Sequence, residues 1–253
     1  MPRLPYRAVI LDLDRTLLRD DKTVSEEALG VLRECAEAGA LLYAATARPI
    51  RAITAYREMI GFRSVTTLNG ALTVTPDGVF AEPIAPADAL SLLEQLGRVG
   101  KAVVSVEAEH GFYANREIPE WQPAVLEDLR VLPGRDRVFK VLASHPSVPA
   151  DRIPVTPPDG VYATVAERTL LQFMSRRATK WNGILRILSH DGIDPADAVC
   201  FGDDQDDVEP IRRCGLGVAV GNALDCVKAV ADDIAPSNND DGVARYLRGL
   251  LSR

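Results

Sequence analysis

Long apolar runs, paired cysteines and an excess of positive charge are all missing from this sequence of 253 residues. No apolar run approaches the ~20 residues that a membrane-spanning helix needs, so we expect no membrane partner. No signal peptide is visible either, because the first residues lead directly into a short strand-like run and acidic residues. The four cysteines have no C-x-x-C spacing and lie in apolar or helical contexts. This pattern favours reduced thiols and a cytoplasmic protein.

Charge and composition narrow the class of function. The formal net charge is −7, which argues against a general nucleic-acid or anionic-membrane partner. Hydrophobic residues make up 47% and charged residues 26% of the chain, as in ordinary globular proteins of one large or two modest domains. An anionic substrate remains compatible with this balance, because a bound metal and one or two basic residues can reverse the local field.

Strand-like and helix-like segments alternate at both ends of the chain, which predicts an α/β fold with one parallel, doubly wound sheet. The predicted strands are 8–13, 40–45, 65–68, 198–201, 216–220 and 233–235, with a hairpin at 72–74 and 79–81. The predicted helices are 25–38, 51–60, 180–190, 207–214, 223–231 and 242–251.

The middle of the chain has a different pattern. An amphipathic helix at 87–99 is followed by strand-like segments at 102–106, 138–143, 161–165 and 170–174, with a proline-rich stretch at 146–158. We interpret this as an α+β domain inserted into the sheet domain. The predicted boundaries are 1–82 and 176–253 for the core and 83–175 for the insertion.

Two carboxylates mark the end of the first predicted strand. Asp12 and Asp14 follow a continuous apolar run, which indicates a strand buried on both faces. In open α/β sheets the reacting groups lie at the carboxyl ends of the strands. Asp12 could attack phosphorus and form an acyl phosphate. Asp14 could serve as the general acid and base, and Thr16 could tether the same loop.

Partners for this pair follow later in the chain, at the ends of further strands or the start of a helix. Thr46 could hold phosphate oxygens with its hydroxyl, and Arg48 is either a substrate anchor or a solvated helix-start residue. Asn69 and Gly70 end the third strand and could border the pocket, although a glycine there also suits a backbone turn. Lys180 begins a helix, where a buried ammonium would neutralise both nucleophile and phosphate.

An acidic segment follows the strand at 198–201. Asp203 suits a direct ligand of Mg²⁺, which binds through one or two carboxylates plus water and phosphate. Asp207 would orient the water shell. Asp204 and Asp206 also suit the first turn of a helix, where the dipole favours acids. Phosphoryl transfer requires a metal and a lysine together, because an anion attacks an anion.

These motifs together resemble the haloacid dehalogenase superfamily, specifically Cof-like phosphatases with a type-IIB cap. The similar segments are Asp12 to Leu18 (family pattern D-x-D-G-T-L), Ala45 to Arg48 (A-T-G-R), Lys180, Gly202 to Asp207 (G-D-x-x-N-D), Gly217 to Ala223 and Asn238 to Ala244. The resemblance implies a Rossmann-like core with an inserted cap that sets specificity. It implies Asp12 as nucleophile and Asp14 as acid and base, with Mg²⁺ on the Asp12 carboxylate, the Asp14 carbonyl and Asp203.

The sequence departs from the family pattern at three positions. Arg15 stands where the family usually has Gly, Ala47 replaces a second Gly, and Asp206 replaces Asn. Arg15 could face the substrate, fold outward or obstruct the phosphate site. The predicted substrate-binding residues are Arg15, Thr46, Ala47, Arg48, Asn69, Gly70 and Lys180. None of the departures removes a predicted catalytic group.

The leading hypothesis is a Mg²⁺-dependent phosphomonoester hydrolase, acting through an aspartyl-phosphate on a small phosphorylated metabolite such as a sugar or polyol phosphate. One alternative is a module that binds a phosphorylated ligand with little turnover. Another is a phosphomutase, which would pass the phosphoryl group to a second hydroxyl. Neither the individual substrate nor the oligomeric state follows from these motifs.

Overall fold

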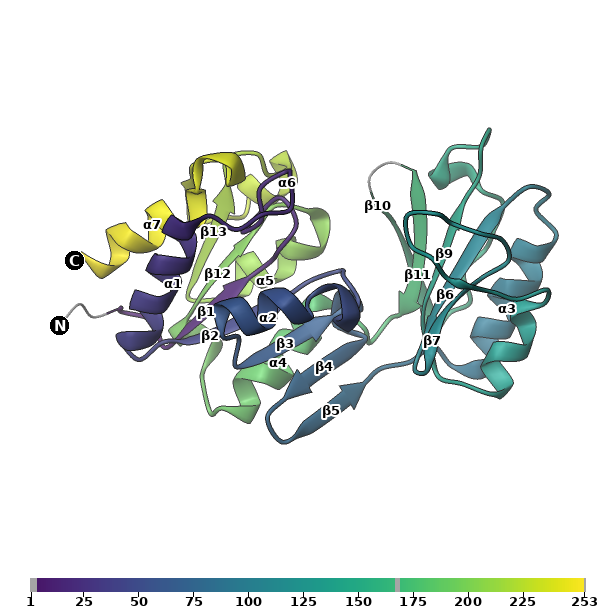
Figure 1. The fold of residues 1–253 in the computed structure, drawn as a ribbon, viewed down its shortest axis with the longest axis horizontal. Coiled ribbons are helices and arrows are strands. Elements are labelled where there is room, and N and C mark those ends of the chain that lie inside the picture. The colour runs from purple at the N-terminus through teal and green to yellow at the C-terminus, as the bar shows by residue number, and fades with distance from the viewer. Residues whose placement is uncertain (1–3, 167–168, 253) are drawn as a thin grey trace. The chain divides into compact units, whose positions relative to one another are not determined.

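The chain divides into two compact units. The computed structural model describes residues 4–166 and 169–252. One unit, the core, comprises the residues up to Phe80 and those from Thr179 onward, and the other, the cap, comprises Ala81–Ala178 (Figure 1). The cap is thus an insertion between two segments of the core.

An eight-stranded sheet forms the centre of the core, in the order β14-β13-β12-β1-β2-β3-β4-β5. The strands are β1 (Ala8–Leu11), β2 (Leu41–Ala45), β3 (Ser64–Thr67), β4 (Leu72–Thr75), β5 (Gly78–Ala81), β12 (Ala198–Gly202), β13 (Leu216–Val220) and β14 (Asp233–Ala235). β1 pairs in parallel with both β2 and β12, so the carboxyl ends of these three strands lie at one edge. β4 pairs antiparallel with β3, so the sheet is mixed at that end.

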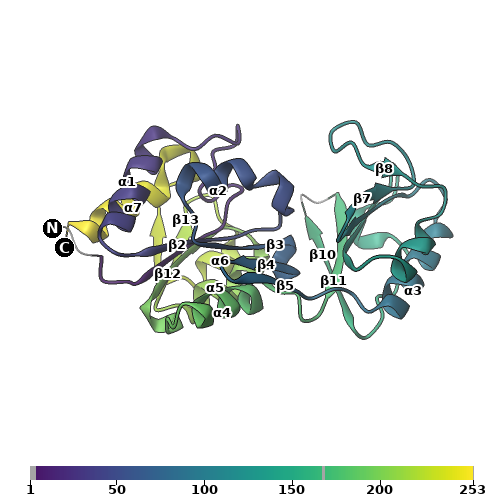
Figure 2. The same ribbon diagram turned by 60° about the horizontal axis from the view of Figure 1, so that its bottom comes forward.

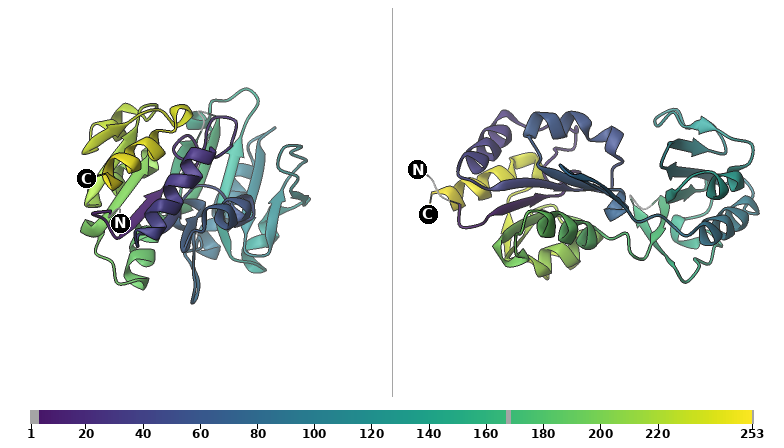
Figure 3. Two further views of the ribbon diagram at one scale, coloured as in Figure 1. Left: turned by 60° about the vertical axis from the view of Figure 1, so that its left-hand side comes forward. Right: turned by 90° about the horizontal axis from the view of Figure 1, so that it is seen from below.

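Helices cover both faces of this sheet, because neighbouring residues of each central strand point to opposite sides. Val9 and Leu11 of β1 belong to the cluster that includes α1 and α7, whereas Ala8 and Ile10 belong to the cluster with α4. Figure 2 and Figure 3 show α1 and α7 on one side of the sheet and α4 and α5 on the other. The core helices are α1 (Glu26–Glu37), α2 (Thr54–Ile60), α4 (Lys180–His190), α5 (Val208–Arg213), α6 (Asp225–Lys228) and α7 (Gly242–Leu251).

Local capping sets where these helices begin and end. The Ser25 hydroxyl accepts a hydrogen bond from the Ala28 amide at the start of α1, and the Thr179 hydroxyl accepts one from the Asn182 amide at the start of α4. α2 ends at Gly61, which has a left-handed backbone conformation. The N-terminal hydrogen bond of Thr179 matters for function, because it makes Lys180 the first residue of α4.

The cap contains a six-stranded sheet in the order β10-β11-β9-β6-β7-β8. Its elements are α3 (Pro86–Gly97), β6 (Val103–Ala108), β7 (Gly111–Ala114), β8 (Ala124–Val125), β9 (Val138–Ser144), β10 (Val161–Ala166) and β11 (Leu170–Ser175). α3 packs its buried residues, such as Leu92 and Leu96, against Val104, Val141 and Phe173 of the sheet. One face of the cap sheet is therefore apolar and covered by a helix.

The α/β fold class predicted from the alternation is confirmed, and the differences are local. β1 ends at Leu11, so Asp12 and Leu13 already belong to the loop, and α6 is shorter than the predicted helix at 223–231. The sequence analysis missed β7 and β8, because their short segments lack a clear apolar alternation. Among the described residues, no helix has the length and apolarity to cross a membrane.

Candidate active site

Three buried aspartates and one lysine meet at the carboxyl edge of the core sheet. Asp12 follows β1, Asp203 follows β12, and Asp207 lies on the short turn after it. The Lys180 ammonium donates to Asp12 Oδ1 at 2.8 Å and to Asp207 Oδ1 at 2.7 Å. All four residues are at most 5% exposed. The structure thus brings together four of the predicted site residues.

The electrostatics of this cluster follow from its burial. Burial raises the pKa of Asp12 well above its usual value, although the Lys180 ammonium acts in the opposite direction. Burial and the neighbouring Asp207 carboxylate raise the pKa of Asp203 to about 6. Burial would lower the pKa of Lys180, but the carboxylates of Asp12 and Asp207 outweigh it and raise that pKa. A single ammonium therefore faces three carboxylates in a region of low water access.

Backbone and hydroxyl donors fix these carboxylates in place. Thr16 donates its hydroxyl hydrogen to Asp203 Oδ1 at 2.9 Å, as expected for a residue that tethers the loop. Asp207 Oδ2 accepts from the backbone amides of Asp203 and Asp204, each at 3.1 Å. A Cβ atom on Gly202 would lie 2.5 Å from Asp207, so only glycine leaves room for this side chain. The glycine directly before Asp203 is thus required by the packing of the Asp207 side chain.

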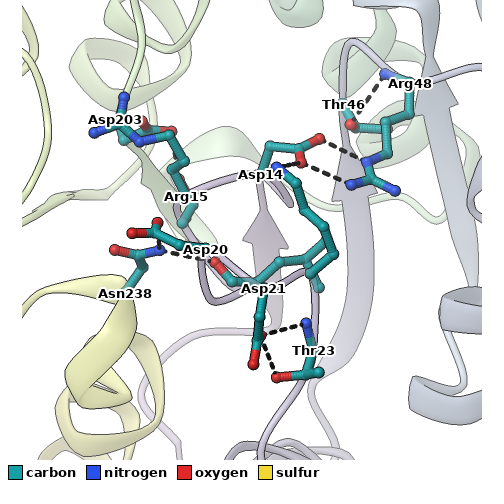
Figure 4. Close-up of polar contacts among 12 residues, drawn as sticks. Asp14, Arg15, Asp20, Asp21, Thr23, Thr46, Arg48, Asp203 and Asn238 are labelled. Atoms are coloured by element: carbon teal, nitrogen blue, oxygen red, sulfur yellow. Dashed lines mark hydrogen bonds and ion pairs between the residues drawn. The ribbon is translucent and has the colours of Figure 1, made fainter. Parts of the chain in front are cut away.

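Asp14 belongs to a separate, more exposed cluster (Figure 4). Arg48 donates from Nε to Asp14 Oδ2 at 2.6 Å and from its terminal nitrogen to Oδ1 at 2.7 Å, and Lys22 donates to Oδ1 at 2.8 Å. Burial alone would raise the pKa of Asp14, but the hydrogen bonds from Arg48 and Lys22 outweigh it and lower that pKa to about 2. Lys22 was not among the predicted site residues, and nothing in its sequence context singles it out.

The remaining predicted residues divide into buried and exposed ones. Thr46 is buried after β2 and its hydroxyl accepts from the Arg48 amide at 3.2 Å. Asn69 is buried and donates through Nδ2 to Asp206, the residue that replaces the family's Asn. Arg15 and Ala47, in contrast, are exposed.

Gly70 has a clear backbone role in addition to any contact with a ligand. Its φ is +98°, and a Cβ there would lie 2.0 Å from the carbonyl oxygen of Thr179. This close approach brings the turn between β3 and β4 against the start of α4. Gly70 therefore positions Lys180 through the backbone, in agreement with the turn interpretation.

Two asparagines support the loop after β1 and were not among the predicted site residues. Asn222 donates to the Arg15 carbonyl at 2.7 Å and accepts from the Asn238 amide at 2.9 Å. Asn238 in turn donates to the Leu18 carbonyl at 3.0 Å. Both lie in the two C-terminal segments that carry the family resemblance, so that resemblance was the available signal for them.

Similarity to known proteins shows the family of this chain. Residues 9–247 match the haloacid dehalogenase-like hydrolase family. The chain belongs to that family. The hydrolase is 28% identical to a 5-amino-6-(5-phospho-D-ribitylamino)uracil phosphatase of Bacillus subtilis over 100% of both chains. It is 28% identical to a phosphoglycolate phosphatase of Methanopyrus kandleri over 96% of each chain. The predicted family and the expectation of an enzyme of the phosphatase type are thereby confirmed.

Solved structures share the fold of the hydrolase. A haloacid dehalogenase-like hydrolase from B. subtilis superimposes with a TM-score of 0.84 at 20% identity, covering 96% of this chain and 99% of that one. A subclass IIB sugar phosphatase superimposes with a TM-score of 0.83 at 19% identity, with the same coverage. These similarities show that the chain shares its overall fold with these solved structures.

Proposed function

We propose that this hydrolase is a Mg²⁺-dependent phosphomonoesterase that acts on a small phosphorylated metabolite through an aspartyl-phosphate at Asp12. The observation that carries the proposal is the buried cluster in which Lys180 bridges Asp12 and Asp207 beside Asp203. A nucleophilic carboxylate, a cation and further acidic oxygens are the groups that phosphoryl transfer needs in one place.

In the first step, an Asp12 carboxylate oxygen attacks phosphorus, and the bond from phosphorus to the leaving alkoxide breaks. Asp14 donates a proton to that alkoxide. In the second step, Asp14 takes a proton from water, whose oxygen attacks the phosphorus of the aspartyl-phosphate. The bond from phosphorus to the Asp12 oxygen breaks, which frees the Asp12 carboxylate and releases inorganic phosphate. Lys180 stays bound to Asp12 and offsets negative charge throughout. Thr46 and the neighbouring backbone amides serve as donors to phosphate oxygens.

The proton transfer requires a change at Asp14. Arg48 and Lys22 hold the pKa of this carboxyl at about 2, so without substrate Asp14 is ionised and has no proton to donate. A bound phosphate dianion would compete for these two cations, and their release from Asp14 would raise its pKa. Substrate binding thereby prepares the acid that the first step needs. We infer that Arg48 has two roles. It pairs with Asp14 when no substrate is bound, and it binds the phosphate group when substrate is present.

The buried cluster fits a divalent cation. Carboxylate oxygens of Asp12, Asp203 and Asp207 lie within 4.8 Å of one another, and hard oxygen ligands are those that Mg²⁺ prefers. Asp12 and Asp203 would hold the ion together with the Asp14 carbonyl, and Asp207 would order its water shell. When bound, the ion would offset the negative charge that accumulates on the phosphoryl group.

The central test replaces Asp12. We expect Asp12→Asn to abolish phosphate release from p-nitrophenyl phosphate and from a panel of phosphorylated metabolites with Mg²⁺, because the amide loses the nucleophile but keeps the shape. Asp204→Asn is the matched control, since Asp204 is exposed and Asn also caps the helical turn. Turnover at the wild-type level in Asp12→Asn, with deamidation excluded by mass, would refute the mechanism. A requirement for a retained bisphosphate would instead indicate a mutase.

A further inference from the structure

Tyr56 contacts both of the cationic residues that hold Asp14. The Arg48 guanidinium lies over its ring, with 5.5 Å between Arg48 Cζ and the ring centroid, which is within the range of a cation–π interaction. The Tyr56 hydroxyl donates a hydrogen bond to the backbone carbonyl of Lys22 at 2.8 Å. Arg48 and Lys22 both donate to the Asp14 carboxylate, and Figure 4 shows the pairing of Arg48 with Asp14. One aromatic residue therefore supports both cations.

The backbone of Lys22 needs this support. Its φ is +68°, a left-handed conformation that costs a residue other than glycine about 1 kcal/mol. Such a conformation persists where the surrounding contacts hold it. The Lys22 amide donates to the Arg19 carbonyl at 2.9 Å, and its own carbonyl accepts from Tyr56. The hydroxyl of Tyr56 thus fixes the point of the loop from which the Lys22 ammonium reaches Asp14.

The position of Tyr56 is set by the core of the protein. It lies on α2, and its half-buried ring packs against the apolar cluster that contains Val9 and Leu11 of β1. Lys22 lies in the loop after β1 and Arg48 in the loop after β2, so Tyr56 joins two loops that are far apart in sequence. The support is therefore anchored in packing rather than in either loop.

We propose that Tyr56 is a positioning residue that keeps Arg48 and Lys22 together while they exchange Asp14 for a phosphate group. The inference rests on the proposed function, in which a phosphate dianion competes with Asp14 for these two cations. In that exchange one anion replaces another, whereas the aromatic ring and the hydrogen bond to the backbone are uncharged contacts that phosphate does not replace. Tyr56 acts through Arg48 and Lys22, and the reacting atoms are left to the catalytic residues.

The first readout is the pKa of Asp14 without substrate, measured by NMR on protein with ¹³C-labelled aspartate, with Asp14→Asn to assign the resonance. Tyr56→Phe removes the hydroxyl alone, and Tyr56→Leu removes the ring as well but keeps an apolar side chain. We expect the pKa to rise from about 2 towards the ordinary value of an aspartate, further in Tyr56→Leu, because each loss loosens a cation that favours the ionised form. Tyr246→Phe is the matched control, since that hydroxyl donates to Asp233 in the same unit.

The second readout is the Kd of inorganic phosphate, measured by calorimetry with Mg²⁺. Loss of the one hydrogen bond in Tyr56→Phe should weaken binding about 5-fold, and loss of the cation–π contact as well in Tyr56→Leu should weaken it at least 10-fold. Tyr246→Phe should bind phosphate as the wild type does. Tyr56→Phe keeps the packing of the ring, so it decides the outcome if Tyr56→Leu does not fold.

A merely structural role for Tyr56 predicts a different result. The melting temperature would fall in the Tyr56 variants, but the pKa of Asp14 and the Kd of phosphate would stay at their wild-type values. That result, or equal changes in Tyr246→Phe, would overturn the inference. A raised pKa with an unchanged Kd would overturn it too, because the two cations would then serve Asp14 alone. Neither readout needs turnover, so absent phosphate release by the wild type would refute the proposed function separately.

Discussion

Arg15 shows at the scale of one residue how a departure from the family pattern is tolerated. Its φ is +58°, in the left-handed region that glycine adopts freely and other residues adopt at a cost of about 1 kcal/mol. The Asn222 side chain holds its carbonyl in this conformation. The side chain itself is exposed, so the arginine leaves the buried cluster of Asp12 and Lys180 intact.

We therefore expect Arg15→Gly to change substrate preference more than chemistry. KM should vary across a substrate panel by more than kcat does, because the guanidinium is outside the reacting cluster. Arg15→Ala is the matched variant: it removes the same guanidinium but keeps the backbone strain. Arg15→Gly should be as stable as wild type or more stable by up to about 1 kcal/mol in urea unfolding. A rise in kcat by orders of magnitude on every substrate would show instead that Arg15 blocks the site.

Single residues also mark the limit of what the sequence predicts. Asp12, Asp203, Asp207 and Lys180 could be placed together, because each follows a strand or begins a helix at one edge of a parallel sheet. The contact of Lys22 with Asp14 could not, because it depends on the path of an irregular loop. The buried Oε1 atom of Gln172 accepts no hydrogen bond from any residue that the structure describes, and this was not predictable either, since an unsatisfied acceptor depends on packing rather than on sequence.

Among the elements, the hairpin of β4 and β5 is tied to the end of α4 by a titratable contact. His190, the last residue of α4, contacts Asp77 of the hairpin turn through Nε2 at 2.9 Å and Asp191 through Nδ1 at 3.1 Å. The hydrogen bond with Asp77 raises the pKa of His190 above its usual value of about 6.5. This contact stabilises the fold fully below that unfolded-state pKa. The contribution is lost as the pH rises through the raised pKa of the folded state.

Asp77→Asn should therefore lower the melting temperature at pH 5.5 and leave it unchanged at pH 9.5. The ring resonances of His190 should titrate above 6.5 in wild type and closer to 6.5 in the variant. Asp194→Asn is the control, because Asp194 is exposed, lies in the core as Asp77 does, and is the N-terminal capping residue of a short helical turn. The contact is exposed at Asp77, so salt should weaken its effect. A wild-type pKa at or below 6.5 would contradict this account.

The elements also show where the pattern of apolar residues was sufficient to predict a strand. The buried strands β1, β2 and β12 follow directly from the sequence, since burial on both faces gives a short continuous apolar run. The antiparallel β4 was predictable only as part of a hairpin. β7 and β8 were not predictable, because pairing with β6 rather than any local preference makes them strands.

For the whole molecule, the buried cluster links ion binding to stability. Three carboxylates face one ammonium, so we expect Mg²⁺ to bind the folded protein and stabilise it. At a free concentration 100 times Kd, the gain is about 2.7 kcal/mol, or roughly 5–10 °C in melting temperature for a chain of this size. Asp203→Asn should remove most of this gain, and Asp204→Asn should keep it. An equal gain in wild type and Asp203→Asn would place the ion elsewhere.

The most direct test of the central claim is a rapid-quench experiment with a ³²P-labelled phosphomonoester and Mg²⁺. We predict a burst of protein-bound label that is released by hydroxylamine, as an acyl phosphate is, and that maps to the peptide containing Asp12. The label should be absent from Asp12→Asn and present in Asp204→Asn. Steady turnover with no bound label at any time, or label on a peptide without Asp12, would contradict the assignment of Asp12 as the nucleophile.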